Sequence, residues 1–231
     1  MLILAVDTSG KNGSMALVRA TESGFDVLEL VPLAGRMYSA QLIPELQNAL
    51  ARQNLKKTDI DAYAVASGPG SFTGLRVGLS TVKALSEVQH KPIATVSVLE
   101  AAARMTAANG NVIVTLDAGR KQLFVGEYNF GPDFKVLRAH ESLVSFEPIF
   151  AKGELVWHSA SRVFSPDGVV REAAASHGVT VEAIPAPQAD MFARIGYQKI
   201  VAGEITPAET LEANYIRASD AELFSLPKLI S

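Results

Sequence analysis

The chain has no cysteine among its 231 residues. It therefore forms no disulfide, carries no thiolate nucleophile and lacks the ligands of a cysteine-based zinc site. A run of about 18 apolar residues, which a membrane span needs, is also absent. The opening apolar stretch meets Asp7 after six residues, which argues against a signal peptide. We therefore expect a cytoplasmic protein with no membrane contact.

Clusters of basic residues are absent as well. The 21 Lys and Arg stand singly or in pairs, and the 24 Asp and Glu give a net charge of −3. Proteins that grip a phosphate backbone alone usually show a concentrated basic face. We therefore expect any nucleic acid in the function of this protein to be held by another subunit.

Hydrophobic residues make up 48% of the sequence and are spread evenly, which is enough to bury the core of one two-lobed domain. Residues 2–6 are continuously apolar, as in a strand buried on both faces. The periodicity predicts further strands at 14–19, 25–30, 61–66 and 92–96, and helices at 39–53, 75–89 and 98–108.

This βββαβαβα order is that of the ribonuclease-H-like lobe of actin, sugar kinases and Hsp70 ATPase domains, and it predicts an α/β actin-like ATPase (ASKHA) fold. Asn109-Gly110-Asn111 breaks the pattern, so we place a lobe boundary there, with lobes at 1–110 and 111–231. The second, smaller lobe is expected to contain strands at 111–118, 122–130 and 154–158 and helices at 169–176 and 191–202. We see no internal sequence repeat.

A glycine-rich loop gives the strongest local signal. It follows a predicted strand and leads into a helix, where free backbone N–H groups can meet an anion. It lacks the Gly-Lys-Ser/Thr ending of a Walker loop and the Gly-x-Ser-x-Gly frame of a hydrolase. Taken alone, the loop is better explained as a tight turn packed against a neighbouring element. Its residues are Gly68, Pro69, Gly70, Ser71, Phe72, Thr73, Gly74, Leu75 and Arg76.

Together with this loop, four other motifs occur in the order seen in TsaB proteins, which the chain resembles well over about residues 1–130 and loosely beyond. The four motifs are Asp7-Thr8-Ser9, Ser14-Met15-Ala16-Leu17, Asp117-Ala118-x-Arg120 and Asn214-Tyr215-Ile216-Arg217.

The resemblance implies a non-catalytic scaffold that docks on TsaD and, with the ATPase TsaE, supports threonylcarbamoyl transfer to adenosine 37 of tRNA. It further implies a homodimer when the chain is alone, tRNA contact only through the complex, and nucleotide only at a subunit junction. TsaD holds a metal through a His-x-x-x-His pair. Here the corresponding stretch, 97–102, carries Val98 and Ala102, which coordinate nothing, so we expect no tightly bound metal.

The chain departs from related proteins at two places, whereas Asp7 matches a position of actin-like kinases. Tyr38 replaces the histidine of the family's Arg-x-His-Ser segment. Asp7 sits where actin-like kinases position magnesium, although an Asp after a first strand is also simple turn chemistry, which we favour. The segment 154–161 lacks the Gly-x-Gly turn that lets backbone approach an adenosine in related folds. Independent nucleotide binding is therefore not expected.

The helix at 75–89 carries two apolar stripes. The larger, Leu75, Leu79, Val82 and Leu85, is expected to pack on the sheet of its own lobe. The smaller one, together with the helix at 39–53, is expected to form a partner interface, unless both stripes are buried within the monomer. The predicted interface residues are Leu42, Leu46, Val77, Thr81, Ala84 and Val88.

Two other functions stay open at this point. One is a catalytic actin-like-fold enzyme, either a small-molecule kinase or a metallopeptidase, which needs a metal or nucleotide site that the motifs do not supply. The other is a homodimer with no link to tRNA.

Overall fold

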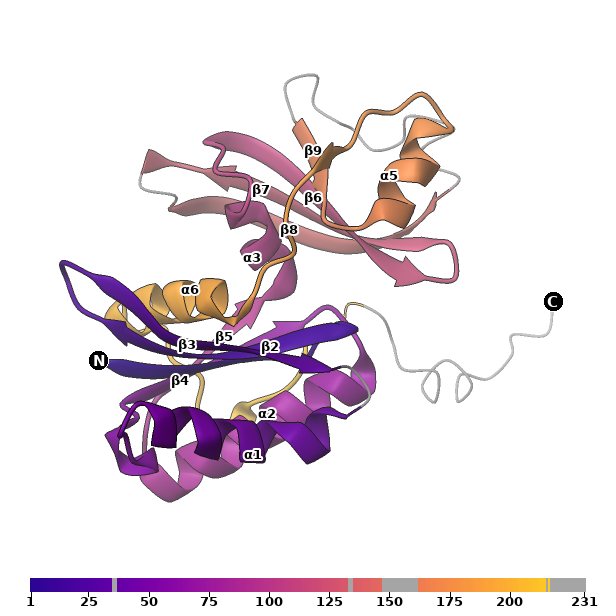
Figure 1. The fold of residues 1–231 in the computed structure, drawn as a ribbon. Coiled ribbons are helices and arrows are strands. Elements are labelled where there is room, and N and C mark those ends of the chain that lie inside the picture. The colour runs from indigo at the N-terminus through magenta and orange to yellow at the C-terminus, as the bar shows by residue number, and fades with distance from the viewer. Residues whose placement is uncertain (35–36, 133–134, 147–161, 215, 217–231) are drawn as a thin grey trace.

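The computed structural model describes residues 1–34, 37–132, 135–146, 162–214 and 216. It shows two five-stranded sheets, one in each of two lobes (Figure 1). The first sheet has the order β3-β2-β1-β4-β5. Its elements are β1 (Leu2–Asp7), β2 (Asn12–Ala20), β3 (Phe25–Ala34), α1 (Tyr38–Arg52), β4 (Ala62–Gly68), α2 (Phe72–Gln89) and β5 (Ile93–Ser97), with a 3₁₀ turn at Lys57–Asp59.

The strands and helices expected in this lobe are confirmed. All six residues of β1 are buried, because helices cover both faces of the sheet. Leu4 faces the core under α1 and α2, and Ile3 faces the opposite core. Strands β1, β2 and β3 pair antiparallel, whereas β1, β4 and β5 pair parallel through helical crossovers, as the helical segments between them require.

The second sheet has the order β10-β9-β6-β7-β8 and repeats the topology of the first, so the structure contains an internal repeat that the sequence does not reveal. In each sheet three successive strands pair antiparallel, and two further strands extend the sheet in parallel on the other side of the first. The elements are β6 (Gly110–Gly119), β7 (Gln122–Phe130), β8 (Val136–Ser145), β9 (Arg162–Ser165), α5 (Gly168–Ala175) and β10 (Glu182–Ala183). Strands β8, β9 and β10 were not expected, and the strand expected at 154–158 lies outside the described residues.

The two halves of the chain exchange a helix. Helix α3 (Val98–Arg104) packs on β6 and β7 of the second sheet, and α6 (Ala189–Val201) packs across the first sheet (Figure 1). Gly196 permits this close approach, because a Cβ there would lie 2.5 Å from the Cβ of Ala64. The second sheet begins with β6 at residue 110, the expected boundary, but α3 before this point packs on the second sheet and α6 after it packs on the first. A helical pattern shows that one face is buried, not which sheet buries it.

After α6 the chain returns along the first lobe as a strap, residues 206–214. Its start donates a hydrogen bond from Thr206 N to Ile93 O over 2.8 Å, at the edge of β5. Leu211 enters the core under α2, beside a 3₁₀ turn at Ala208–Thr210. Asn214 N then donates to Ser67 O over 2.7 Å at the end of β4. The strap therefore ends beside the glycine-rich loop.

Among the described residues, no helix combines the length and apolarity that crossing a membrane requires.

Candidate functional site

The glycine-rich loop packs directly on the turn that follows β1. A Cβ at Gly70 would lie 2.4 Å from Ser9 O, and one at Gly74 would lie 2.1 Å from Thr8 O. Ser71 N donates to Ser9 O over 2.6 Å, and the Thr8 hydroxyl donates to Gly74 O over 2.7 Å. The glycines thus allow the loop to contact the turn after β1. This is the tight turn, packed against a neighbouring element, that the sequence of the loop indicated.

The loop leads into α2, and Ser71 is the N-cap of this helix. Ser71 Oγ accepts a hydrogen bond from Gly74 N over 3.3 Å, as expected for serine at this position. Phe72 is 37% exposed, and the Arg76 guanidinium lies 3.7 Å from the centre of its ring. This stacked pair and Thr73 form the outer rim of the loop.

Asp7 closes the turn from inside. Its Oδ1 accepts hydrogen bonds from Ser9 N over 2.9 Å and from Ser9 Oγ over 2.6 Å, which confirms the turn interpretation. Burial raises the pKa of the Asp7 carboxyl, and the two hydrogen bonds from Ser9 oppose that shift. The carboxylate is therefore engaged within its own turn and lies away from solvent.

Tyr38 covers the same turn from the start of α1. Its Oη donates to Gly10 O over 2.8 Å, and its ring packs on Gly13, where a Cβ would meet it at 2.7 Å. Burial, followed by the nearby Asp7 charge, raises the pKa of Tyr38 to about 12, so the phenol stays a hydrogen-bond donor at neutral pH. Tyr38, which replaces the family histidine, thus packs over the turn between β1 and β2.

These contacts predict a pH-dependent effect of Asp7→Asn. A carboxyl whose pKa is higher in the folded than in the unfolded protein stabilises the fold below its unfolded pKa, and this contribution is lost as pH rises through the folded pKa. At neutral pH the buried charge opposes folding, whereas an asparagine keeps an acceptor for Ser9. The variant should melt above the wild type at pH 7, and the difference should shrink towards pH 3. Melting curves across this range check it, and a variant that melts lower at pH 7 would contradict it.

The two stripes of α2 lie in different environments. Leu75, Leu79 and Val82 are buried in the core, and Leu85 packs against it, as expected. On the other stripe Val88 is 75% exposed. Ala84 is exposed too, and Val77 and Thr81 are half-buried.

Two of the predicted interface residues do not lie on this surface. Leu42 and Leu46 of α1 are only 2% and 4% exposed and belong to the core of the first lobe. Including them was wrong, because an apolar face at helical spacing is equally consistent with a core and with an interface. The large apolar side chain that α1 does expose to solvent is Ile43, at 40%.

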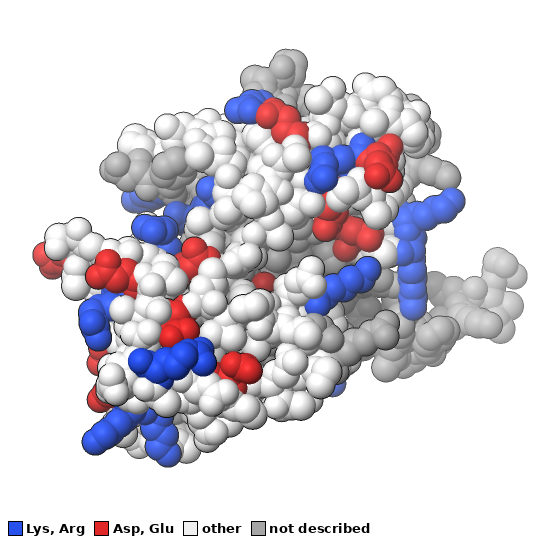
Figure 2. Space-filling view, viewed as in Figure 1, with Lys and Arg blue, Asp and Glu red and all other residues white. Residues whose placement is uncertain are grey.

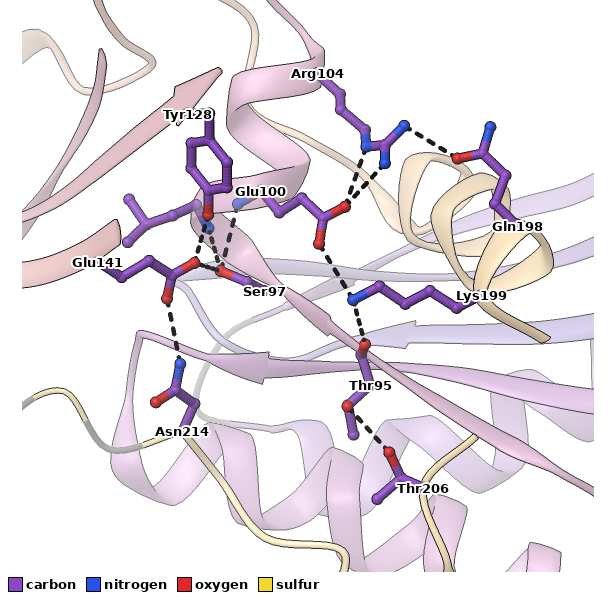
Figure 3. A network of polar contacts seen from close by, with 11 residues as sticks. Thr95, Ser97, Glu100, Arg104, Tyr128, Glu141, Gln198, Lys199, Thr206 and Asn214 are labelled. Carbon is purple, nitrogen blue, oxygen red and sulfur yellow. Dashed lines mark hydrogen bonds and ion pairs between the residues drawn. The ribbon is translucent and has the colours of Figure 1, made fainter. Parts of the chain in front are cut away.

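A polar network joins the lobes where α3 begins (Figure 3). Glu141 of β8 accepts hydrogen bonds from the hydroxyls of Ser97 and Tyr128, and its other oxygen accepts from Asn214 Nδ2 over 3.2 Å. Sequence reasoning missed this cluster, because Glu141 lies on a strand that the apolar pattern did not reveal.

The same network continues between the exchanged helices. Glu100 on α3 is 8% exposed and pairs with Arg104 at 3.0 Å and with Lys199 of α6 at 3.2 Å. Arg104 also donates to Gln198 over 3.0 Å, and Lys199 to Thr95 O over 3.1 Å (Figure 3). One nearly buried carboxylate thus ties α3 to α6.

The surface in Figure 2 shows Lys and Arg interspersed with Asp and Glu, without one dominant basic area on that face. Among the described residues, no group of three or more His, Cys, Asp or Glu side chains is placed to hold a metal ion. The Tyr215 and Arg217 positions of the last motif lie outside the described residues, as does Arg36.

The two duplicated lobes, each with a sheet of three antiparallel and two parallel strand positions, define an α/β protein of the actin-like ATPase fold. The protein family described as TsaD, tRNA N6-adenosine threonylcarbamoyltransferase, matches residues 31–215, and the chain belongs to it, with its relatives in the TsaB (YeaZ) group that its motifs resemble.

The relatives agree with this placement. TsaB of Bacillus subtilis, named a tRNA threonylcarbamoyladenosine biosynthesis protein, is 32% identical over 131 residues, which are 56% of each chain. TsaB of Escherichia coli is 33% identical over 138 residues, which are 55% of each chain. The matched part thus spans about half the length of these curated relatives. YeaZ from Pseudomonas aeruginosa shares the fold with a TM-score of 0.74 at 22% identity, over 93% of this chain and 100% of that one.

Proposed function

We propose that the chain is a non-catalytic scaffold subunit that binds a TsaD homologue and supports, with a TsaE homologue, threonylcarbamoyl transfer to adenosine 37 of tRNA in the cytoplasm. tRNA is contacted only through the complex, and nucleotide only at a subunit junction. The names of the relatives support the pathway. The observation that carries the scaffold role is the outer stripe of α2.

This stripe has the character of a docking face. Its residues Val77, Thr81, Ala84 and Val88 recur every three to four positions, so they form one row along the helix. None of them is larger than valine, so another helix can pack closely on this row. The opposite stripe supplies the core of the lobe, and Val77 also packs against that core. Further burial of Thr81, Ala84 and Val88 therefore requires a second molecule. When no TsaD homologue is present, a second copy of the chain occupies the same face.

Catalysis by the chain alone is less well supported. The carboxylate of Asp7 is bound by Ser9 and covered by Tyr38, so it does not reach a metal-bound phosphate without rearrangement. At the TsaD metal position Val98 and Ala102 are packed in the cores. The chemistry therefore belongs to the partner, and a kinase or metallopeptidase remains the second candidate.

The test is Val88→Glu in the full chain, mixed with the TsaD homologue of the same organism. Because Val88 is 75% exposed, the variant should keep the wild-type melting temperature and circular dichroism. Burying an unpaired carboxylate in an interface costs several kcal/mol, so binding should weaken by about 100-fold or more. Titration by calorimetry and gel filtration measure this loss, together with loss of self-association.

Val201→Glu is the matched control, since Val201 is 65% exposed and lies at the end of α6. It should bind like the wild type. If Val88→Glu also binds with undiminished affinity, the docking face is elsewhere. If the unmodified chain alone turns over ATP, the catalytic alternative gains support instead.

A further inference from the structure

Glu141 is held by groups from both lobes. Two of its donors belong to the first lobe, namely Ser97 at the end of β5 and Asn214 on the strap. The third, Tyr128, stands on the neighbouring strand β7 of its own sheet. Figure 3 shows the three side chains converging on this single carboxylate. All three partners are neutral groups that donate a hydrogen bond, and Glu141 accepts from each of them.

The donors are fixed in direction. Ser97 caps α3, and its Oγ accepts from Leu99 N over 3.2 Å and from Glu100 N over 3.3 Å, which leaves the hydroxyl proton for Glu141. Tyr128 is 3% exposed, and its ring stacks on Phe130 with centroids 5.8 Å apart. Hydrogen bonds to an ionised carboxylate are stronger than those between neutral groups. The cluster therefore favours one arrangement of α3 against the second sheet.

The strap connects this cluster to the glycine-rich loop. Asn214 binds Glu141 through its side chain and Ser67 O through its backbone N–H. Its own carbonyl oxygen lies against Gly68, where a Cβ would approach it to 2.8 Å, and the φ of Gly68 is +119°. A side chain at this position would push the strap away. Glycine here thus serves the strap as well as the loop.

We propose that Glu141 is an interlobe latch, a carboxylate that, beside the Glu100 network, holds the two sheets in one relative orientation and couples the second lobe, through the strap, to the loop that begins α2. Removing the latch leaves both sheets intact but lets them take more than one relative orientation. The latch is independent of the docking partner proposed above.

The absence of cysteine allows a direct measurement, because introduced cysteines are labelled without background. One spin-label pair joins the lobes, Glu22→Cys in the β2–β3 turn and Glu172→Cys on α5. A second pair, Glu22→Cys with Thr58→Cys, lies within the first lobe. All of these positions are exposed. Electron–electron distance distributions of the full chain then report the orientation of the lobes and the integrity of one lobe separately.

With Glu141→Ala, the distribution across the lobes should gain a second population, whose ratio to the first rises about tenfold or more, as the loss of a charged acceptor implies. The pair within the first lobe should not change. Glu127→Gln on β7 is the control and should leave both distributions unchanged. If Glu141→Ala leaves the distribution across the lobes unchanged, or broadens both pairs alike, there is no latch.

Asn214→Ala keeps the proposal testable if Glu141→Ala does not fold. It removes one donor from an exposed position and should shift the distribution across the lobes in the same direction, by a smaller factor. An unchanged distribution in this variant, with Glu141→Ala unfolded, would mean that Glu141 supports the fold without latching the lobes.

Discussion

Phe192→Ala is expected to destabilise the protein by about 3–5 kcal/mol and lower its melting temperature by roughly 10 °C. Phe192 is fully buried on α6, in the core that α6 forms with the first sheet. Truncation removes an aromatic ring and leaves a cavity between the helix and strands that lie far from it in sequence, in the first half of the chain. Thermal and denaturant unfolding of the full chain measure the effect.

Val201→Ala is the control for this prediction, because it shortens an exposed side chain on the same helix. Its effect should stay within about 0.5 kcal/mol. Equal effects of the two substitutions would mean that α6 does not cover the first sheet. Hydrogen exchange shows where the structure is destabilised, because amides of β1 and β2 should lose protection in Phe192→Ala.

The second large effect is expected from Gly74→Ala. The new Cβ would lie 2.1 Å from Thr8 O, and a backbone oxygen cannot rotate away as a side chain would. Relief requires a shift of the turn after β1 or of the first turn of α2. We expect a loss of about 3 kcal/mol, at the upper end of overpacking effects, and a melting temperature lower by roughly 6–12 °C.

Gly10→Ala, in the turn against which Gly74 packs, provides the comparison. Its nearest neighbour would be Asn12 O at 3.8 Å, an ordinary contact, so this variant should melt close to the wild type. A Gly74→Ala protein as stable as Gly10→Ala would show that the loop and the turn are not in firm contact. Binding assays with Gly74→Ala also test whether the loop geometry matters for α2 as a docking helix.

The sequence predicted the first lobe well because its strands are buried on one or both faces and its helices are amphipathic. The pattern in β1 is unambiguous for this reason. β8 lies at the edge of its sheet and mixes polar with apolar residues, so it has no such pattern. Because β8 was not predicted, Glu141 was not recognised either, since the position of a single glutamate can be inferred only from the strand that carries it.

The candidate site was predictable only in part. The motif loop was found from its glycines, and the two stripes of α2 were found from helical spacing. Spacing could not separate Leu42, which is buried in the core, from Val88, which is exposed. Nor could it show that Tyr38 reaches back to Gly10, because that contact joins segments 28 residues apart.

The exchange of α3 and α6 has a consequence for synthesis of the chain on the ribosome. When the first five strands have emerged, one face of their sheet, with Ile3, Ala5 and Val18, still lacks its cover. Apart from Val98 and Ala101 of α3, that cover is α6, which begins at Ala189, so most of the chain must be translated before it arrives. During this interval an apolar sheet surface is open to nascent-chain chaperones and to other polypeptides. The N-terminal half of the gene therefore does not encode a self-sufficient folding unit, and natural or engineered breaks between the halves would have to supply the missing helix in trans.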